Sequence, residues 1–475
     1  MTDDNISDYA RRLLPWLVAV AFFMQALDTT ILNTAVPAIA RALDVAPLSM
    51  KAVASSYTLS LAVFIPISGW MADRFGTRHV FAAAIGFFTL GSLLCGLAGN
   101  IHWLVACRVL QGFGGAMMVP VGRLTMVRTF AKSELIRVMS FVAIPGLIGP
   151  MLGPVAGGLI IKYFHWSVIF LLNVPVGLIG LYLVYRHLPD FREAHWHRLD
   201  VAGLALFGTG IALLSYVLEV FGEHFLSTRE IAALLAFALV LLGAYGVNSL
   251  RTRYPLLQLS LFRTRTFSAA VIGAFVARLG VGGIPFLFPL LYQVGLGFTP
   301  VQSGLLMMPQ AIAAISLKPL TSRILNWLGY RNVLVANTIG LGVMILLFAT
   351  IGRDTPAWLI VVQVFCFGLF TSMQYTSMNT LVFADVPAAQ SSGASTIAST
   401  AQQLSISFGV ASASLVTALF IPDRFHSEPA QMIHGIHLAF LVLGALTIVS
   451  AVVFAKLRGD DGNAVSQHKV VLPTG

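Results

Sequence analysis

Charged residues are scarce in this sequence. Asp, Glu, Lys and Arg together make up 10% of its 475 residues, whereas apolar residues make up 57%. A globular protein of this length needs many more charged side chains on its water-facing surface, so the composition excludes a soluble domain and predicts a polytopic membrane protein. The net charge is +10, but the basic residues are interspersed along the chain and form no dense patch. We therefore expect no nucleic-acid partner.

Cysteine is also rare. Cys95, Cys107 and Cys366 all lie in apolar stretches, and they provide neither a disulfide framework nor the spacing of metal ligands. The sequence contains no phosphate-binding loop, no nucleophile elbow and no paired catalytic carboxylates. We therefore predict that the protein is not an enzyme and has no catalytic residue, no metal and no cofactor. ATP is not the expected source of energy.

Long apolar segments, in contrast, recur along the whole chain. A transmembrane helix needs about 20 apolar residues, and the sequence predicts fourteen such spans, at residues 13–36, 48–71, 80–98, 103–125, 135–161, 168–187, 201–220, 231–250, 267–292, 302–322, 332–351, 357–383, 391–420 and 433–457. With the N-terminus inside, the inner loops and tails hold 20 Lys and Arg residues and the outer loops hold 6. Because cytoplasmic loops carry the excess of positive charge, both termini are predicted to be cytoplasmic.

An internal repeat links the second span to the tenth. Pro66-Ile-Ser-Gly69 and Asp73-Arg74-Phe75-Gly76-Thr77-Arg78 have a fainter echo, 253 residues later, in Pro319-Leu-Thr-Ser322 and Asn326-Trp327-Leu328-Gly329-Tyr330-Arg331. Pro47 and Pro300 match at the same offset. Repeats that flank a site at the middle of the membrane are typical of secondary transporters. We predict a six-helix half at 1–190, two extra transmembrane helices in 191–262, a second six-helix half at 263–458 and a cytoplasmic tail at 459–475.

One acid, Asp28, lies well inside the first span. Gln25, Asp28 and Thr29 share one face of the predicted helix, and Asn33 follows one turn beyond Thr29. A carboxylate at this depth is costly and by default faces an interior cavity and has a function. Removal from water favours its neutral form, which suits it to pick up and release a proton. The alternative is a neutral Asp28 that holds a neighbouring helix by a hydrogen bond.

Two arginines also lie inside spans, where a guanidinium stays protonated and seeks carboxylates or carbonyls. Arg108, in the fourth span, could approach ionised Asp28 and help to eject its proton, or it could extend to the nearer membrane surface. Arg278, in the ninth span, is too central for that and is followed by the flexible stretch Gly280, Gly282 and Gly283. It could neutralise an acidic substrate group or brace the second half. Gln25, Asn33 and Arg278 are the candidate residues of a substrate cavity.

Several motifs resemble those of a known family. Gly69-Trp-Met-Ala-Asp73-Arg74-Phe-Gly76-Thr-Arg78 resembles the loop signature of the major facilitator superfamily, and Arg108-Val-Leu-Gln111-Gly112-Phe-Gly114-Gly115 resembles its fourth-helix motif. The stretch with Gly149, Pro150, Gly153, Pro154, Gly157 and Gly158 is similar to the fifth-helix motif of the antiporter branches. Two further stretches resemble the markers of the fourteen-span drug:proton antiporters (EmrB-like). They are Leu27-Asp28-Thr-Thr30-Ile31-Leu-Asn33-Thr-Ala35-Val-Pro37 and Phe170-Leu-Leu-Asn173-Val-Pro175-Val-Gly177. Within that family the HsrA/MdtD-type multidrug exporters are most similar, through residues 23–28, 114–123 and 262–267.

The resemblance implies an all-α major facilitator fold with two pseudo-symmetric six-helix halves and two additional central helices. It implies export of small amphipathic compounds in exchange for protons, by alternating access, across the bacterial cytoplasmic (inner) membrane. Lipids, protons and a small-molecule substrate are then the partners. We expect a functional monomer, and no feature of the sequence indicates a periplasmic adaptor. A dedicated exporter of one metabolite, such as an amino-acid derivative or a siderophore, is the alternative; a proton-coupled importer is disfavoured by the Gly- and Pro-rich fifth span.

The resemblance also assigns roles to residues. Asp28 and Arg108 would couple transport to protons. Gly69, Asp73, Arg74, Gly76 and Arg78 would form a conformational latch, with Asp73 against the positive N-terminus of the helix that begins at Ser391. Gly149, Pro150, Gly153, Pro154, Gly157 and Gly158 would form a bent helix that seals one end of the cavity. In the second copy of the loop signature Asn326 replaces the acid, so any latch there is expected to be weaker.

Overall fold

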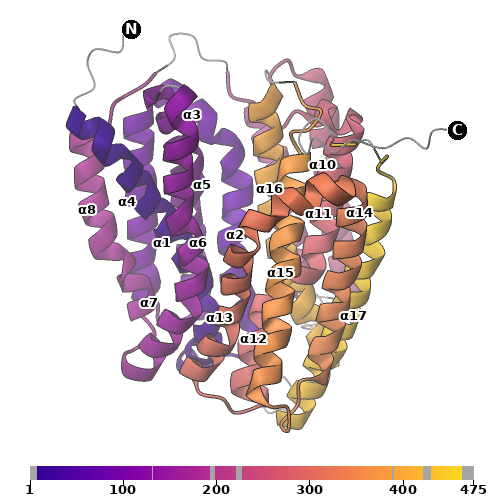
Figure 1. Cartoon of the computed structure of the whole chain (residues 1–475). Helices are drawn as coiled ribbons and strands as arrows, with labels where there is room; N and C mark the ends of the chain where they lie inside the picture. Colours follow the sequence, from indigo (N-terminus) through magenta and orange to yellow (C-terminus); the bar gives the residue numbers. More distant parts are fainter. Residues whose placement is uncertain are drawn as a thin grey trace, which may run out of the picture.

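The computed structural model describes residues 8–130, 132–192, 198–220, 227–387, 390–420, 429–459 and 461–462. Within these residues the regular secondary structure is entirely helical. Figure 1 shows one elongated bundle, in which the first residues of α1 and the last residues of α17 lie at the same end. The prediction of an all-helical fold is confirmed.

The helices follow the predicted spans in order. The first half holds α1 (Asp8–Ala42), η2 (Pro47–Met50), α2 (Lys51–Phe64), η3 (Ile65–Ile67), α3 (Ser68–Phe75), α4 (Thr77–Gly96), α5 (Ile101–Thr129), α6 (Lys132–Tyr163), α7 (Val168–Leu171) and α8 (Asn173–His187). The middle holds α9 (Val201–Val220) and α10 (Thr228–Arg251). The second half holds η4 (Leu259–Arg263), α11 (Arg265–Val281), α12 (Ile284–Pro289), η5 (Leu290–Gly295), α13 (Pro300–Ser316), α14 (Lys318–Leu347), η6 (Phe348–Thr350), α15 (Ala357–Leu381), α16 (Ser391–Leu419) and α17 (Pro429–Ala455).

Helix occupies every predicted span. Among the described residues, 11 helical segments are long and apolar enough to cross a membrane, so the chain is a multi-pass membrane protein. The other three predicted spans correspond to α6, α16, and α13 with the start of α14, all of which are helical. The structure is therefore consistent with fourteen spans. Four of the predicted spans are divided into shorter helices: the second beside Pro66, the sixth at Leu172, the ninth at Gly282–Gly283 and again after Pro289, and the tenth at Leu317.

The internal repeat has a counterpart in the backbone. Gly76, between α3 and α4, has a φ of 90°, and Gly329, inside α14, has a φ of 73°. Only glycine adopts this conformation readily, and each glycine turns the chain from one span into the next. The equivalent loops of the two halves therefore make the same kind of turn, although Asn326 replaces the acid in the second copy.

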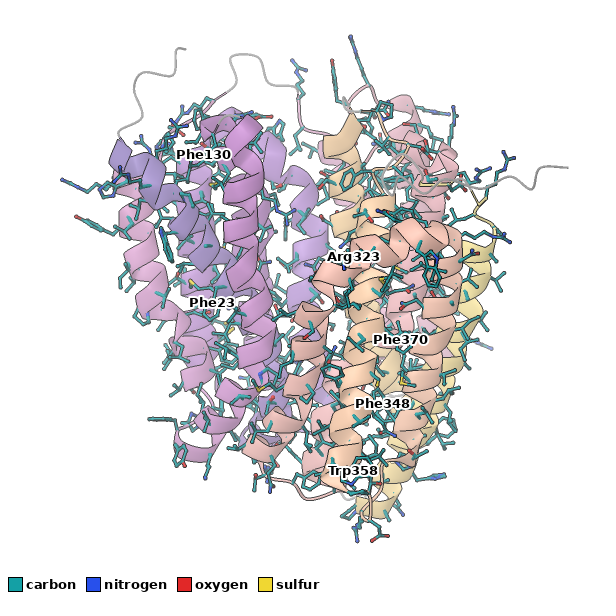
Figure 2. The ribbon with its side chains drawn as sticks, in the orientation of Figure 1. Phe23, Phe130, Arg323, Phe348, Trp358 and Phe370 are labelled. Atoms are coloured by element: carbon teal, nitrogen blue, oxygen red, sulfur yellow. The ribbon has the colours of Figure 1, made fainter. Side chains whose placement is uncertain are left out.

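The two halves contact one another toward the end of the bundle that holds the start of α2 and the end of α16. Gln293 Nε2 donates to the Thr34 carbonyl oxygen at 2.8 Å, and Ser414 Oγ donates to the Leu48 carbonyl oxygen at 3.2 Å. A β-carbon on Gly158 would lie 2.5 Å from the Pro300 carbonyl oxygen, so α6 and α13 approach backbone to backbone. At the same end the second half is packed by buried aromatic rings, including Phe288 and Phe348 with centroids 4.9 Å apart (Figure 2).

The two extra helices form a hairpin. The rings of Phe207 in α9 and Tyr245 in α10 lie 5.3 Å apart, and Gly208 of α9 packs on Val63 of α2. The outer helix, α10, exposes large apolar side chains such as Phe237, Leu239 and Val240. Exposed apolar side chains on a membrane-spanning helix suit contact with lipid.

Candidate functional site

Asp28 lies in the middle of α1 and is almost completely buried, with 1% of its surface exposed. The sequence around it packs closely on α6, because a β-carbon on Gly149 or Gly153 would lie within 3 Å of Ala26 or Thr30. The hydroxyl of Thr30 donates to the carbonyl oxygens of Ala26 and Leu27, so it adds no competing partner for the acid. Small residues on α6 thus fix the depth and rotation of α1, and with them the position of Asp28.

Both carboxylate oxygens of Asp28 accept hydrogen bonds. Arg108 Nη1, from α5, donates to Oδ2 at 2.5 Å. Gln111 Nε2, one turn further along α5, donates to Oδ1 at 2.9 Å. Asn173 Nδ2, at the first residue of α8, donates to the same oxygen at 3.2 Å. Three donors, one of them charged, therefore converge on the two carboxylate oxygens.

A second set of contacts orients these donors. Ser92 Oγ, from α4, accepts from Gln111 Nε2 at 2.6 Å and from Asn173 Nδ2 at 3.1 Å. Arg108 Nη1 also donates to Gln111 Oε1 at 2.6 Å, and the Arg108 guanidinium carbon lies 4.2 Å from the centre of the Tyr57 ring of α2. We call Asp28, Ser92, Arg108, Gln111 and Asn173 the acid cluster. It joins α1, α4, α5 and α8, and Tyr57 adds α2.

The acid cluster depends on the charge of Asp28. A buried ion pair gains most of its energy from its complete set of hydrogen bonds, and the loss of one partner leaves the other charge uncompensated. Protonation of Asp28 would remove the negative charge that Arg108 neutralises and would turn one acceptor oxygen into a donor. The contacts of four helices thus meet at the one acidic side chain of the cluster.

In the described part of the chain no hydrogen bond joins the predicted substrate-cavity residues to Asp28. Gln25 and Asn33 are half-buried on α1, and among the described residues neither forms a hydrogen bond with the acid. Arg278 belongs to the second half, where it is 4% exposed and lies over the ring of Tyr375, with the guanidinium carbon 4.8 Å from the ring centre. The structure thus separates two buried arginines: Arg108 is paired with an acid, and Arg278 is not.

The residues of the predicted latch meet partners within the first half. Asp73 accepts from Arg128 Nη2 of α5 at 2.9 Å, and the Arg74 guanidinium packs over the rings of Trp70 and Phe75. Gly69 lies on α3 with open space at its α-carbon. The backbone N–H of Arg78 donates to Asp190 Oδ1 at 3.1 Å, and a β-carbon on Gly76 would collide with the same carboxylate. The side chains of Ser391 and Ser392 are outside the described residues, so the predicted contact of Asp73 with the start of α16 stays a prediction.

The Gly- and Pro-rich helix α6 contacts both halves. Gly149, Gly153 and Gly157 face α1, and a β-carbon on Gly157 would lie 2.6 Å from the Ile31 carbonyl oxygen. Gly158 faces Pro300 of α13, and the Pro154 carbonyl oxygen would lie 2.2 Å from a β-carbon on Gly304. The side chain of Pro150 is outside the described residues. Close packing therefore accounts for these glycines, and part of that packing closes the two halves on each other.

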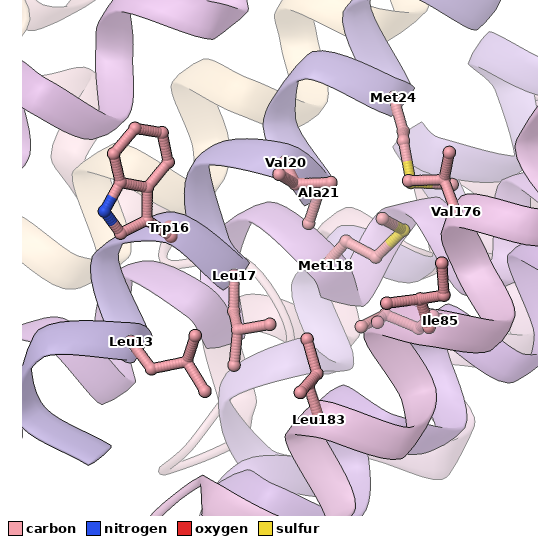
Figure 3. Close-up of a pocket in the computed structure, with 12 residues that line it drawn as sticks. Leu13, Trp16, Leu17, Val20, Ala21, Met24, Ile85, Met118, Val176 and Leu183 are labelled. Carbon is pink, nitrogen blue, oxygen red and sulfur yellow. The ribbon is translucent and has the colours of Figure 1, made fainter. Parts of the chain in front are cut away.

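An apolar pocket of about 250 Å³ lies in the first half, toward the start of α1 (Figure 3). Its lining comes from α1, α4, α5 and α8, the same helices that hold the acid cluster, and includes Leu17, Ile85, Met118 and Leu183. No residue of the acid cluster lines it; Met24, one helical turn before Asp28, is its nearest lining residue on α1. Trp16 and Ile179, which also line it, are exposed, so the pocket opens on the outer surface of the bundle.

Sequence reasoning missed three members of the acid cluster as partners of Asp28. Ser92, Gln111 and Asn173 are neutral polar residues inside apolar spans, and such residues have many structural uses. Gln111 and Asn173 both lie in motifs that resemble the family, which was the available signal. Among the described residues no group of three or more His, Cys, Asp or Glu side chains lies close enough together to hold a metal ion.

Comparison with known proteins shows which family this chain belongs to. The model of the Major Facilitator Superfamily matches residues 18–410. The chain belongs to this superfamily. It is therefore a secondary transporter rather than an enzyme, and the acid cluster lies in the first half of a transporter fold.

Two of the most similar curated relatives carry the name "Putative multidrug resistance protein MdtD". The one from Shigella boydii serotype 4 is 40% identical over 456 residues, which cover 96% of this chain and 97% of the relative. The one from Salmonella heidelberg is 39% identical over 445 residues, which cover 94% of each chain.

Solved structures share the fold at low sequence identity. A POT family transporter in complex with 5-aminolevulinic acid has a TM-score of 0.70 at 14% identity, with 96% of this chain and 97% of that chain covered. A bacterial homologue of the human lysosomal transporter Spinster, in an inward-facing and unoccupied conformation, has a TM-score of 0.67 at 13% identity, with 94% and 97% covered.

Proposed function

We propose that this protein exports small amphipathic compounds in exchange for protons, by alternating access, across the bacterial cytoplasmic membrane with both termini inside. The single observation that carries the proposal is the buried Asp28, held by Arg108 at 2.5 Å inside the first half of a major facilitator fold. An ionisable pair at this depth is costly and is expected to have a role in moving protons or substrate. The proton gradient is the energy source, and the division into halves at 1–190 and 263–458 with two extra helices between them is part of the proposal.

The coupling step runs through α1. Ionised Asp28 ties α1 to α4, α5 and α8 through the acid cluster. Thr34, six residues further along the same helix and about 9 Å away along its axis, accepts the hydrogen bond from Gln293 of the second half. Protonation of Asp28 loosens α1 within its own half, and the same helix carries that change to the contact between halves. Proton binding and the opening of the halves are thereby linked without direct contact between proton and cargo.

The latch acts at the opposite end. Ser407 donates to the Ser55 carbonyl oxygen at 3.2 Å and Ser414 donates to the Leu48 carbonyl oxygen at 3.2 Å, so α2 and α16 run antiparallel in one register. Continuing this register along both helices brings Asp73 toward the first residues of α16. A carboxylate there is attracted to the positive end of the helix, and this favours the state in which the inner ends of the halves are together.

The nature of the cargo follows from relatives and composition. The curated relatives are named for multidrug resistance. The chain holds 33 Phe and 15 Met residues, and methionine adapts to varied apolar shapes. The apolar pocket of the first half adds surface of the same kind. Dedicated export of one metabolite is the second candidate, and the unpaired Arg278 favours it because a fixed positive charge selects among cargoes.

Reconstituted transport tests the proposal. Purified protein in proteoliposomes is first assayed by counterflow against a panel of dyes, biocides and metabolites. A pH gradient is then imposed, with the acidic compartment on the side toward which the cargo is to be moved. We expect counterflow of several amphipathic compounds and accumulation that collapses with nigericin. Accumulation that survives loss of the pH gradient would contradict proton coupling, and counterflow of a single compound would replace multidrug export with dedicated export.

A further inference from the structure

Arg278 holds a buried positive charge without a protein counter-charge. Its side chain is 4% exposed, and its Nε and Nη2 atoms are buried with no hydrogen-bond partner. Among the described residues no carboxylate pairs with it, whereas Arg108 in the first half pairs with Asp28. Buried donors are nearly always satisfied, and an unsatisfied group next to a charge is costly. The arrangement therefore calls for an explanation outside the protein's own side chains.

The two unpartnered nitrogens share one edge of the guanidinium. Nη2 is on the same side of the group as the Nε–H, so these two N–H groups point in parallel from one edge. This edge forms two parallel hydrogen bonds with the two oxygens of a carboxylate. The guanidinium carbon lies over the ring of Tyr375, 4.8 Å from the ring centre. The ring stabilises the cation, and Nε and Nη2 remain without hydrogen-bond partners.

In the described part of the second half no acid is placed to use this edge. The predicted spans of that half contain no Asp or Glu. Asp354 lies in an exposed loop at one end, and at the other end Asp385 accepts from Thr266 Oγ1 at 2.8 Å and Asp461 pairs with Arg265. Asp28, the acid deepest in the first half, already has both oxygens occupied. A ligand can supply the carboxylate that these residues do not.

The position of Arg278 is one that transport would use. The 253-residue offset that relates Pro47 to Pro300 places Arg278 at the position of Gln25, one turn before Asp28 on the first helix of the other half. The buried Gln25 Oε1 is likewise without a partner. Arg278 also adjoins the bend at Gly282, where the Arg278 carbonyl oxygen would lie 2.8 Å from a β-carbon on Gly282 and 3.0 Å from one on Gly409 of α16. The backbone of Arg278 thus lies where α11 approaches α16, and its guanidinium lies over Tyr375 of α15.

We propose that the Nε and Nη2 edge of Arg278, backed by Tyr375, binds a carboxylate of the cargo, so that the transported compounds are acid-bearing amphipathic molecules. This inference rests on the proposed function in that the ligand is taken to be cargo. Permanent cations are disfavoured at this site, because a second positive charge would be repelled where no protein acid screens it.

Equilibrium binding to three probes of the same shape tests the inference. The probes are 2-naphthoate, 2-naphthamide and 2-naphthylmethylammonium, measured by equilibrium dialysis on the full chain in nanodiscs without any gradient. We expect naphthoate to bind at least about tenfold more tightly than the amide, as a charge-assisted bidentate pair allows, and the ammonium probe to bind most weakly. In Arg278→Gln the preference for naphthoate should disappear while affinity for the amide stays the same. Arg278→Lys, which keeps the charge but loses the two-point fork, should fall between.

Arg323→Gln is the matched control, because Arg323 is an exposed arginine of the same half (Figure 2). It should keep the preference of the unmodified protein for naphthoate. The inference is wrong if folded Arg278→Gln binds naphthoate as well as the unmodified protein does, and Arg278 is then a brace for the second half. It is also wrong if the unmodified protein does not distinguish naphthoate from the amide, a comparison that needs no variant to fold. Failure of proton coupling would show instead in gradient-driven transport and leave these affinities unchanged.

Discussion

The strongest quantitative prediction concerns the pair of Arg108 and Asp28. Both side chains are buried, at 1% exposure each, and are joined at 2.5 Å. In Arg108→Gln, Asp28 keeps the donors Gln111 and Asn173 but loses its only charged partner. Removal of one member of a buried ion pair costs about 3–5 kcal/mol, because the other charge is left uncompensated. We expect a loss of stability near the lower value, since two neutral donors remain and Asp28 can take up a proton.

The same substitution should cost much less once the acid is gone. In Asp28→Asn the buried charge of Arg108 has already lost its partner, so adding Arg108→Gln removes an uncompensated charge and should cost nothing or restore some stability. The double-mutant cycle should therefore give a coupling energy of about 3 kcal/mol, at the upper end for residues in one network.

Thermal unfolding of the four purified proteins in detergent measures this cycle. Arg186→Gln, at the exposed end of α8, serves as the control and should have little effect on stability. Proton release on addition of cargo, followed with a pH dye in weak buffer, should also fall in Arg108→Gln because Asp28 then stays protonated. Additive losses of stability, together with unchanged proton release, would show that the two side chains are not coupled.

Two further predictions concern the latch and the topology. Asp73→Asn should slow turnover more than it weakens cargo binding, because the latch biases conformations and does not line the cavity; collapse of affinity with unchanged cysteine accessibility would contradict this. Tags at both termini should report from the cytoplasm. A reporter fused after Glu223, a residue outside the described ones, should report from the periplasm. Fusions to alkaline phosphatase and green fluorescent protein can measure both. A cytoplasmic signal after Glu223 would mean that the seventh and eighth spans are misplaced.

Much of the fold could be predicted from the sequence for one physical reason. In lipid every backbone polar group has to be bonded within its own segment, so each long apolar stretch becomes a helix. The helices accordingly occupy all the predicted spans. The breaks inside them were harder to foresee, because Pro66 and Pro289 divide spans while Pro37 and Pro120 remain within single helices. Whether a proline breaks a helix depends on what neighbouring helices provide for the freed carbonyl.

The site was only half predictable. A charge in an apolar span stands out, so Asp28, Arg108 and Arg278 could be singled out from the sequence alone. Which of the two arginines meets Asp28 depends on which helices are neighbours, and hydropathy does not contain that information. Ser92, Gln111 and Asn173 come from three different helices and meet at one point only after folding. The pairing of Asp73 with Arg128 is likewise a contact between distant segments.

The account rests on Asp28 as the residue that carries the proton, and Asp28→Asn tests this most directly. Asparagine has nearly the same shape and inserts in the same place, but its amide cannot exchange a proton. In inverted membrane vesicles with an acidic interior, the unmodified protein and the loop control Asp354→Asn should accumulate cargo until nigericin removes the pH gradient. Asp28→Asn, present at the same level, should show no accumulation driven by the pH gradient. Accumulation by Asp28→Asn at the rate of the unmodified protein would show that Asp28 does not carry the proton.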